Sequence, residues 1–281
     1  MNEKIKFIFW GTPIVASKTL QILIDAGLIP EVVITNPDRP SGRGLTFSPS
    51  PVKILAQKYN IPVLTPEKLD EKFLDKLSTC LPAGRLLNFE LNIVVAYGKI
   101  LPENIINMPK YGTINIHYSL LPKYRGASPL ESALLNGDTE TGISIQKMVK
   151  KMDAGPILSE KKIEINNTIS KDELREILIN EGVNLLVKIL PDYIDGKIEL
   201  QDQDETQASH CKKIQKQDGE INPDGDPILN YNKYRAYSGW PGVFFFKDGM
   251  RIKITRARLE DGKFIIEKII PEGKKEQDYL L

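Results

Sequence analysis

Strands that alternate with a helix at the start of the chain constrain its fold more than any other feature. Residues 5–10 form an apolar, β-prone run, and Gly11-Thr12-Pro13 turns the chain into residues 14–26, which have helical apolar spacing. Residues 31–35 are a second apolar run. Because parallel strands need a crossover such as a helix, this order predicts an α/β fold, with a Rossmann-like, mostly parallel sheet and flanking helices.

The same alternation continues through the first 200 residues. The pattern predicts helices at 51–59, 66–77 and 170–190, and strands at 91–96, 113–117, 141–148 and 157–165. Thr65 followed by Pro66 marks one helix start, and Ser170 with Glu173 forms a capping box at another. The turn after the first strand lacks the G-x-G-x-x-G pattern, which disfavours dinucleotide binding.

Composition indicates an ordinary globular protein of about two domains, since the chain has 281 residues, 41% of them hydrophobic and 27% charged. No stretch approaches the roughly 20 apolar residues of a membrane helix, and the N-terminus lacks a signal-peptide pattern, so we expect a cytoplasmic protein. Cys80 and Cys211 are the only cysteines. Their number and spacing predict free thiols and no metal site. A net charge of +1 means that nucleic-acid binding would depend on local patches.

A change of pattern near residue 200 predicts two domains. Residues 1–200 would form a catalytic domain, and the polar residues 201–208 a linker, because they lack apolar periodicity. In residues 209–281, short β-type runs at 242–247, 250–256 and 262–270 are separated by two Asp-Gly hairpin signals. We expect a small, OB-like β-barrel there.

Residues 113–129 hold the clearest candidate site. Asn115 and His117 share one face of the predicted strand because side chains alternate along a strand. Ser119 to Pro122 interrupt the strand, and a loop leads to a helix near Leu130. Open α/β sheets bind ligands at such strand ends. Since a lone histidine is more often structural, the pattern alone predicts a site and no particular reaction.

At these residues the chain resembles a known family. The sequence Asn115-Ile-His117-Tyr-Ser-Leu-Leu-Pro122, then Arg125-Gly126 and Met152-Asp153-Ala-Gly155, is similar to the folate-dependent formyltransferases that use 10-formyltetrahydrofolate. Residues 216–221 and 235–242 extend the resemblance into the C-terminal part. The resemblance is strongest to the family members that act on methionine-charged initiator tRNA. The implied activity is transfer of the formyl group to the methionine α-amine, which prepares that tRNA for translation initiation.

The resemblance also implies roles for particular residues. Asn115 and His117 would donate hydrogen bonds to the developing oxyanion, and Asp153 would orient the imidazole and favour its protonated form. Neither a metal nor a covalent intermediate is implied. The folate site implied by the resemblance comprises Val95, Ala96, Tyr97, Gly98, Ser119, Leu120, Leu121 and Pro122.

Two basic regions are candidates for tRNA contacts. The loop at residues 37–44 has two prolines and two glycines, and such a loop is by default only a solvated connection. The resemblance implies instead that it reaches the tRNA acceptor end. The candidates are Arg39, Arg43 and Lys53 here and Lys247, Arg251 and Lys253 in the C-terminal domain, where Arg256 and Arg258 lie close by in sequence. The expected partners are initiator tRNA and the folate, with no membrane, and the expected state is a monomer.

Three other functions are compatible with the pattern. A formyltransferase acting on a sugar-nucleotide amine or another small amine would keep Asn115, His117 and Asp153 but would not need the 37–44 loop. A formyltetrahydrofolate hydrolase would use water as acceptor. A catalytically inactive RNA-binding protein is the non-enzyme alternative, suggested by residues 78–90, which look like an insertion and should form a surface excursion.

Overall fold

The structure is a computed structural model that describes residues 5–41, 46–79 and 89–279. The chain divides into two compact units. The first comprises residues 1–117, 143–161 and 179–204, and the second comprises residues 118–142, 162–178 and 205–281. The expected excursion at 78–90 lies mostly outside the described residues, as does Cys80.

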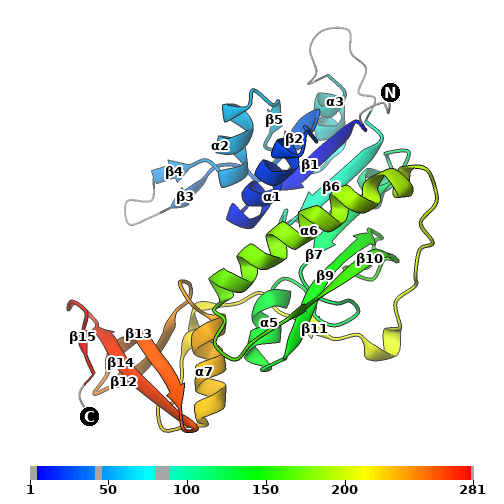
Figure 1. Ribbon diagram of the computed structural model, residues 1–281. Coiled ribbons are helices and arrows are strands. Elements are labelled where there is room, and N and C mark those ends of the chain that lie inside the picture. Colours follow the sequence, from blue (N-terminus) through cyan, green and yellow to red (C-terminus); the bar gives the residue numbers. More distant parts are fainter. Residues whose placement is uncertain (1–4, 42–45, 80–88, 280–281) are drawn as a thin grey trace. The chain divides into compact units, whose positions relative to one another are not determined.

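A seven-stranded sheet organises the N-terminal part, in the order β10-β9-β7-β6-β1-β2-β5 (Figure 1). The neighbours β7, β6, β1, β2 and β5 pair in parallel, whereas β9 runs antiparallel to β7. The predicted α/β fold with a mostly parallel sheet is confirmed. The strands are β1 (Phe7–Gly11), β2 (Val32–Ile34), β5 (Val63–Leu64), β6 (Leu91–Val95), β7 (Thr113–His117), β9 (Glu140–Lys147) and β10 (Ile157–Glu164).

The core of this unit forms because its parallel strands are mostly apolar and buried. Every residue of β1 and of β6 is buried, as expected for strands covered on both faces. The Trp10 ring packs edge-on against Phe73 and Tyr97, and its Nε1 donates to Asn92 Oδ1 at 3.0 Å. The core therefore extends to the chain segments that follow β5 and β6.

Helices α1 (Ile14–Asp25), α2 (Pro51–Lys58), α3 (Glu71–Thr79) and α4 (Glu103–Ile106) connect these strands, and α6 (Lys171–Ile194) follows β10. The Ser50 hydroxyl caps α2 by accepting from Lys53 N at 3.0 Å. The predicted capping box of α6 is present, because the Glu173 carboxylate accepts from Ser170 N at 2.8 Å and the Ser170 hydroxyl from Glu173 N at 3.4 Å. None of the described helices is long and apolar enough to cross a membrane.

Two local predictions were wrong in this unit, and one short strand was not predicted. The helix predicted to start at Pro66 starts at Glu71, since the Asp70 carboxylate accepts from Phe73 N at 3.1 Å and supplies the cap. The two-residue strand β5 was missed, because it exists only through its pairing with β2. The 37–44 loop is not wholly irregular, since β3 (Arg39–Ser41) pairs with β4 (Thr46–Ser48) in an antiparallel hairpin.

The C-terminal part is a separate antiparallel sheet in the order β12-β13-β14-β15, as a β-type domain predicts. Helix α7 packs against β13 and β14, and also against α5 (Pro129–Leu135). In the described residues, this sheet and helix stand where a small barrel was expected. The elements are α7 (Pro227–Ala236), β12 (Val243–Lys247), β13 (Met250–Glu260), β14 (Lys263–Pro271) and β15 (Gln277–Asp278).

Two short elements complete this unit, β8 (Arg125–Gly126) pairing in parallel with β11 (His210–Cys211). Arg125 is fully buried and forms a two-pronged ion pair with Glu205, at 2.9 and 3.1 Å. Glu205 belongs to the short 3-10 helix Glu205–Gln207, and a second one spans Lys216–Gly219. Part of the segment expected to be a linker therefore carries a specific structural contact.

Candidate active site

Four buried polar side chains share one face of the β7–β9 pair. Asn115 and His117 alternate with apolar residues on β7, and only 9% and 5% of their surfaces are exposed. Gln146 lies directly opposite Asn115 in the strand register, and Ser144 lies opposite His117. Residues opposite each other project from the same face of a sheet. The strand alternation thus creates a polar patch inside an apolar sheet.

Asp153 joins this patch from the loop after β9. Its Oδ2 lies 3.8 Å from His117 Nδ1, and its Oδ1 accepts a hydrogen bond of 2.9 Å from Gln146 Nε2. The Asp153 backbone has a positive φ of 50°. A non-glycine residue rarely adopts this conformation, and such residues are typical of functional sites. The structure therefore brings together the three residues that the sequence singled out for catalysis.

Gln203 holds the loop that carries Asp153. Its Nε2 donates to the backbone carbonyl of Asp153 at 3.0 Å and to that of Gly155 at 2.7 Å. A side chain at Gly155 would place its Cβ 1.7 Å from the Lys147 carbonyl oxygen, so only glycine is compatible with this path. Neither Gln146 nor Gln203 was predicted from the sequence. A polar residue within the buried strand β9 was a usable signal for Gln146, whereas nothing local distinguishes Gln203 from a linker residue.

Two further groups in the patch bear on its chemistry. The Gln146 Oε1 atom is buried and has no hydrogen-bond partner among the described residues. The Ser144 hydroxyl donates to the Glu160 carboxylate on β10. A buried acceptor without a partner is costly, so Gln146 Oε1 is suited to receive a donor from a bound molecule.

The segment after β6 is held in a defined conformation. Ala96 and Gly98 have positive φ angles of 46° and 84°. The Tyr97 carbonyl accepts from Thr12 Oγ1 at 3.0 Å and from Asn36 Nδ2 at 2.8 Å. This carbonyl belongs to the backbone at 95–98 that was expected to contact the folate, and it is already hydrogen-bonded within the protein.

The Tyr97 side chain is part of the core. Burial raises the pKa of its hydroxyl to about 12, and the Tyr97 oxygen has no partner among the described residues. The neutral phenol is therefore the form present at physiological pH.

The other expected folate residues, Ser119, Leu120, Leu121 and Pro122, belong to the second unit. The buried Ser119 hydroxyl donates to the Lys123 carbonyl at 2.6 Å, which closes a tight loop. Leu121 is also buried, and the Pro122 carbonyl accepts from Ser209 N at 3.2 Å. These contacts give the loop a fixed shape.

The candidate tRNA residues near the hairpin differ in their surroundings. Arg39 is exposed on β3. Lys53 is partly buried and its Nζ contacts both oxygens of Asp38, at 2.8 and 2.9 Å. Arg43 lies outside the described residues. Lys53 thus contributes to the base of the hairpin.

The C-terminal candidates lie on β12 and β13. Lys247 is exposed, whereas the Arg251 guanidinium stacks over the Phe244 ring at 3.9 Å. Lys253 stands opposite Phe244 in the strand register. The neighbouring Arg256 and Arg258 both pair with Glu267, which lowers the positive charge on that part of the sheet.

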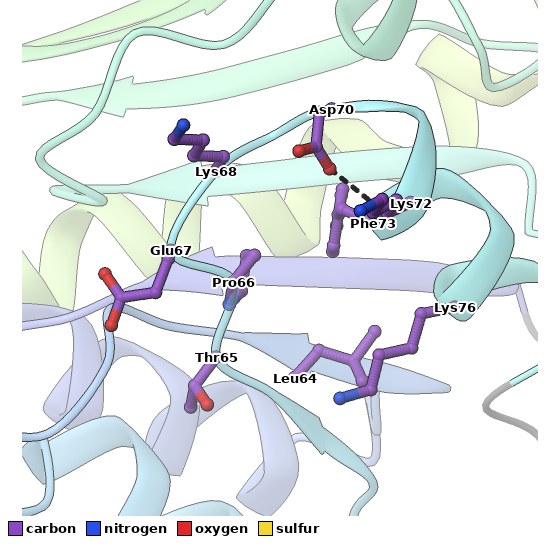
Figure 2. Close-up of a pocket in the computed structure, with 9 residues that line it drawn as sticks. All are labelled: Leu64, Thr65, Pro66, Glu67, Lys68, Asp70, Lys72, Phe73 and Lys76. Atoms are coloured by element: carbon purple, nitrogen blue, oxygen red, sulfur yellow. Dashed lines mark hydrogen bonds between the residues drawn. The ribbon is translucent and has the colours of Figure 1, made fainter.

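A pocket of about 320 Å³ opens at the carboxyl end of β5 (Figure 2). Its lining includes none of the candidate catalytic, folate or tRNA residues, so the pocket and the polar patch on β7 are different features of the first unit. Within residues 5–41, 46–79 and 89–279, no group of three or more His, Cys, Asp and Glu side chains could hold a metal ion.

The fold thus combines an open α/β sheet, on which an Asn, a His and an Asp lie close together, with a C-terminal part made of a four-stranded sheet and a helix. Residues 3–190 match the family model described as formyl transferase, and residues 213–277 match the formyl transferase C-terminal domain. The chain belongs to the formyl transferase family.

Known relatives are similar to nearly the whole chain. A methionyl-tRNA formyltransferase of Sulfurihydrogenibium sp. (strain YO3AOP1) is 40% identical over 256 residues, which are 90% of this chain and 80% of that protein. A crystal structure of a sugar 3N-formyl transferase in the presence of dTDP and 5-N-formyl-THF superposes with a TM-score of 0.66 at 20% identity, covering 92% of this chain and 88% of the other. A methionyl-tRNA formyltransferase from Clostridium thermocellum superposes with a TM-score of 0.62 at 19% identity, covering 95% of this chain and 98% of that one. The two structures support the fold.

Proposed function

We propose that this protein transfers the formyl group of 10-formyltetrahydrofolate to the α-amine of methionine on initiator tRNA, producing formylmethionyl-tRNA for translation initiation. The observation that carries this proposal is the 40% identity, over 90% of the chain, to a protein that acts on methionyl-tRNA. A sugar-nucleotide amine is the second candidate acceptor, because a sugar formyltransferase shares the fold at 20% identity.

The reaction needs a hydrogen-bond donor aimed at the formyl oxygen. The methionine amine attacks the formyl carbon, negative charge develops on the carbonyl oxygen, and the bond from carbon to N10 of the folate breaks. Asn115 and His117 project from the same face of β7, so both can donate to that oxygen. Donors fixed on a buried strand need little reorganisation during the reaction.

Proton transfer accompanies this step, because the amine loses a proton and N10 gains one. The Asp153 carboxylate, 3.8 Å from His117 Nδ1, is placed to orient the imidazole. Gln146 occupies the other Asp153 oxygen. We assign proton movement to His117 and Asp153, directly or through a bound water.

The folate and the tRNA are assigned to separate regions. The backbone at 95–98 and the loop at 119–122 are proposed to bind the folate, since fixed backbone groups suit the donors and acceptors of a pterin ring. Arg39, Arg43 and Lys53 are proposed to contact tRNA phosphates, together with Lys247, Arg251 and Lys253. The division into residues 1–200, 201–208 and 209–281 stays a proposal.

A competition assay tests the proposed acceptor. The protein is given 10-formyltetrahydrofolate with methionine-charged initiator tRNA, a UDP-amino sugar and water as alternative acceptors. The proposal predicts formylation of the charged tRNA alone. Formylation of the sugar would show that the protein is a formyltransferase with a different acceptor. Release of free formate would indicate a hydrolase.

A further inference from the structure

A polar segment that follows α6 is fastened to the β9–β10 loop, which carries Asp153. Gln201 pairs with Ile157 at the start of β10 through backbone atoms, in hydrogen bonds of 2.8 and 3.0 Å. Two residues later, the Gln203 side chain donates to the carbonyls of Asp153 and Gly155, at 3.0 and 2.7 Å. These residues all belong to the first unit. The segment is therefore held beside the loop by its backbone and reaches it with one side chain.

Gln203 uses its full donor capacity on the β9–β10 loop. A primary amide carries two N–H groups on one nitrogen, and Gln203 Nε2 donates to two carbonyls. Because carbonyl oxygens only accept, these partners define the orientation of the amide. The two carbonyls lie on either side of Ala154, and one of them is that of Asp153 itself. The Gln203 side chain thus restricts the ψ angle of Asp153 directly.

The backbone conformation that Gln203 holds is an unusual one for an aspartate. The φ angle of Asp153 is 50°, in the left-handed region that non-glycine residues rarely adopt. Strand β9 restricts the same loop, since any side chain at Gly155 would clash with the Lys147 carbonyl. A strained backbone persists only where the surrounding contacts define it. The two hydrogen bonds from Gln203 are contacts of this kind.

The exact position of the loop matters because the contact between Asp153 and His117 is long. Asp153 Oδ2 lies 3.8 Å from His117 Nδ1, beyond the usual hydrogen-bond length of about 2.7 to 3.2 Å. A shift of the loop by about 1 Å would therefore make or break a direct hydrogen bond. Gln146 holds the other carboxylate oxygen from β9. That bond fixes one atom of the side chain, whereas Gln203 fixes the backbone behind it.

We infer that Gln203 is a positioning residue for the proposed formyl transfer, because it holds the β9–β10 loop with the Asp153 carboxylate directed at His117. The contacts of Gln203 described above are with backbone carbonyls, so it acts through Asp153. This inference rests on the proposed function, since it concerns the same proton transfer. The segment expected to be a linker thus contributes to the candidate active site.

The test substitutes the two glutamines of this segment in parallel. Gln203→Met keeps the length of the side chain and removes both donors. Gln203→Lys keeps a donor that can bridge two carbonyls, as Lys99 Nζ does in the same unit at 2.7 and 3.0 Å. Gln201→Met and Gln201→Lys are the matched controls, because Gln201 is exposed and is held through its backbone. The single-turnover formylation rate is measured for each protein, below the lowest melting temperature of the set.

We expect Gln203→Met to lower this rate by about 10- to 100-fold, the scale of a misplacement of about 1 Å in an active site. Gln203→Lys should recover most of the loss, and both Gln201 variants should match the wild type. A normal rate in Gln203→Met would overturn the inference. Equal losses in Gln203→Met and Gln203→Lys would also overturn it, because the hydrogen-bond donor would then not be what matters.

A double-variant cycle shows whether Gln203 acts through Asp153. The protein with Asp153→Asn and Gln203→Met should be about as slow as Asp153→Asn alone, since positioning a carboxylate has no effect once the carboxylate is absent. A further loss of about 10-fold or more would give Gln203 a separate role and overturn the inference.

The same measurements keep this inference distinct from the proposed acceptor. The rates are followed with whichever acceptor the wild type uses, water included. A wild type that formylates a sugar amine instead of the charged tRNA would refute the proposed acceptor. The ratios between the variants on that sugar would still decide the role of Gln203.

Discussion

At the scale of single residues, Gln146 is placed to orient the Asp153 carboxylate. It donates to one carboxylate oxygen and leaves the other directed at His117. A hydrogen bond to a charged group contributes about 1.5 to 3 kcal/mol. If that contribution fixes Asp153 during the reaction, Gln146 is a positioning residue for proton transfer.

The variant Gln146→Met keeps the length of the side chain and removes the donor. We expect kcat to fall by about 10- to 100-fold, which corresponds to 1.4 to 2.8 kcal/mol. Steady-state kinetics check this. The control is Thr141→Val on the same strand, because the buried Thr141 hydroxyl has no partner among the described residues. A kcat for Gln146→Met equal to that of the control would show that Gln146 does not position Asp153 for proton transfer.

Tyr97→Phe tests the buried phenol. Because a buried donor without a partner is unfavourable, we expect the substitution to raise the free energy of unfolding by about 1 kcal/mol at pH 7. The raised pKa of about 12 adds a pH dependence. The neutral form is favoured in the folded state, so stability is complete below the ordinary value near 10 and falls as pH rises from about 10 toward 12.

Urea unfolding at pH 7 and at about pH 10.5 separates these effects. The wild type should lose more stability than Tyr97→Phe between the two pH values. An equal loss in both proteins would show that the Tyr97 hydroxyl does not titrate as its burial implies.

The polar patch on β7 and β9 also shows what a sequence can specify at this scale. Strand alternation places Asn115 and His117 on one face, so their proximity was predictable. Gln203 was not, because its contact with Asp153 spans 50 residues of sequence. Local patterns carry no information about which distant side chain will support a loop.

At the scale of elements, α7 shows that a helix without a continuous apolar face can be defined by its capping residues and its packing. The sequence pattern predicted short strands and turns from residue 209 onward and did not predict this helix, whose signals lie at its ends. The Asp226 carboxylate accepts from Ile228 N at 2.8 Å and from Leu229 N at 2.9 Å, and Pro227 occupies the first turn. Its packing against α5, β13 and β14 supplies the rest, and such packing cannot be read from the local sequence.

Asp226→Ala should therefore lower the free energy of unfolding by about 1 kcal/mol. Urea denaturation measures the change, with Asp224→Ala as the control, since the exposed Asp224 side chain makes no hydrogen bond to a described residue. Equal stability of the two variants would mean that tertiary packing alone fixes the start of α7.

Elements that carry a clear signal within their own residues were predicted, whereas the shortest elements were not. Strand β1 and helix α6 were predicted because each carries its signal within its own residues, an apolar run in one case and a capping box in the other. The hairpin β3–β4 and the strand β5 have three or fewer residues per strand. Elements this short exist through pairing with a partner, so their sequence alone gives little indication of them.

At the scale of the whole molecule, charge is nearly balanced and tRNA binding must rely on local cations. The net charge is +1, and Arg256 and Arg258 are paired with Glu267. Lys253 forms no ion pair with a described residue and lies next to Gly242. It is therefore the stronger candidate for a phosphate contact on β13.

Lys253→Ala should raise the KM for methionyl-tRNA several-fold, leave kcat unchanged and reduce the salt dependence of tRNA binding by about one phosphate contact. Titration of KM against salt concentration checks this, with the exposed Lys263→Ala on β14 as the control. An unchanged salt dependence of tRNA binding would mean that Lys253 does not contact a tRNA phosphate.

The central claim is formyl transfer to charged initiator tRNA at the Asn115–His117–Asp153 patch. Its most direct test is the single-turnover rate of formylation of methionyl initiator tRNA by the wild type, His117→Ala and Asn115→Ala, each at saturating 10-formyltetrahydrofolate. We expect formylation by the wild type and rates lower by about 100- to 1000-fold in each variant, the usual cost of losing one donor to a developing oxyanion. A His117→Ala protein with a near-normal rate would contradict the account.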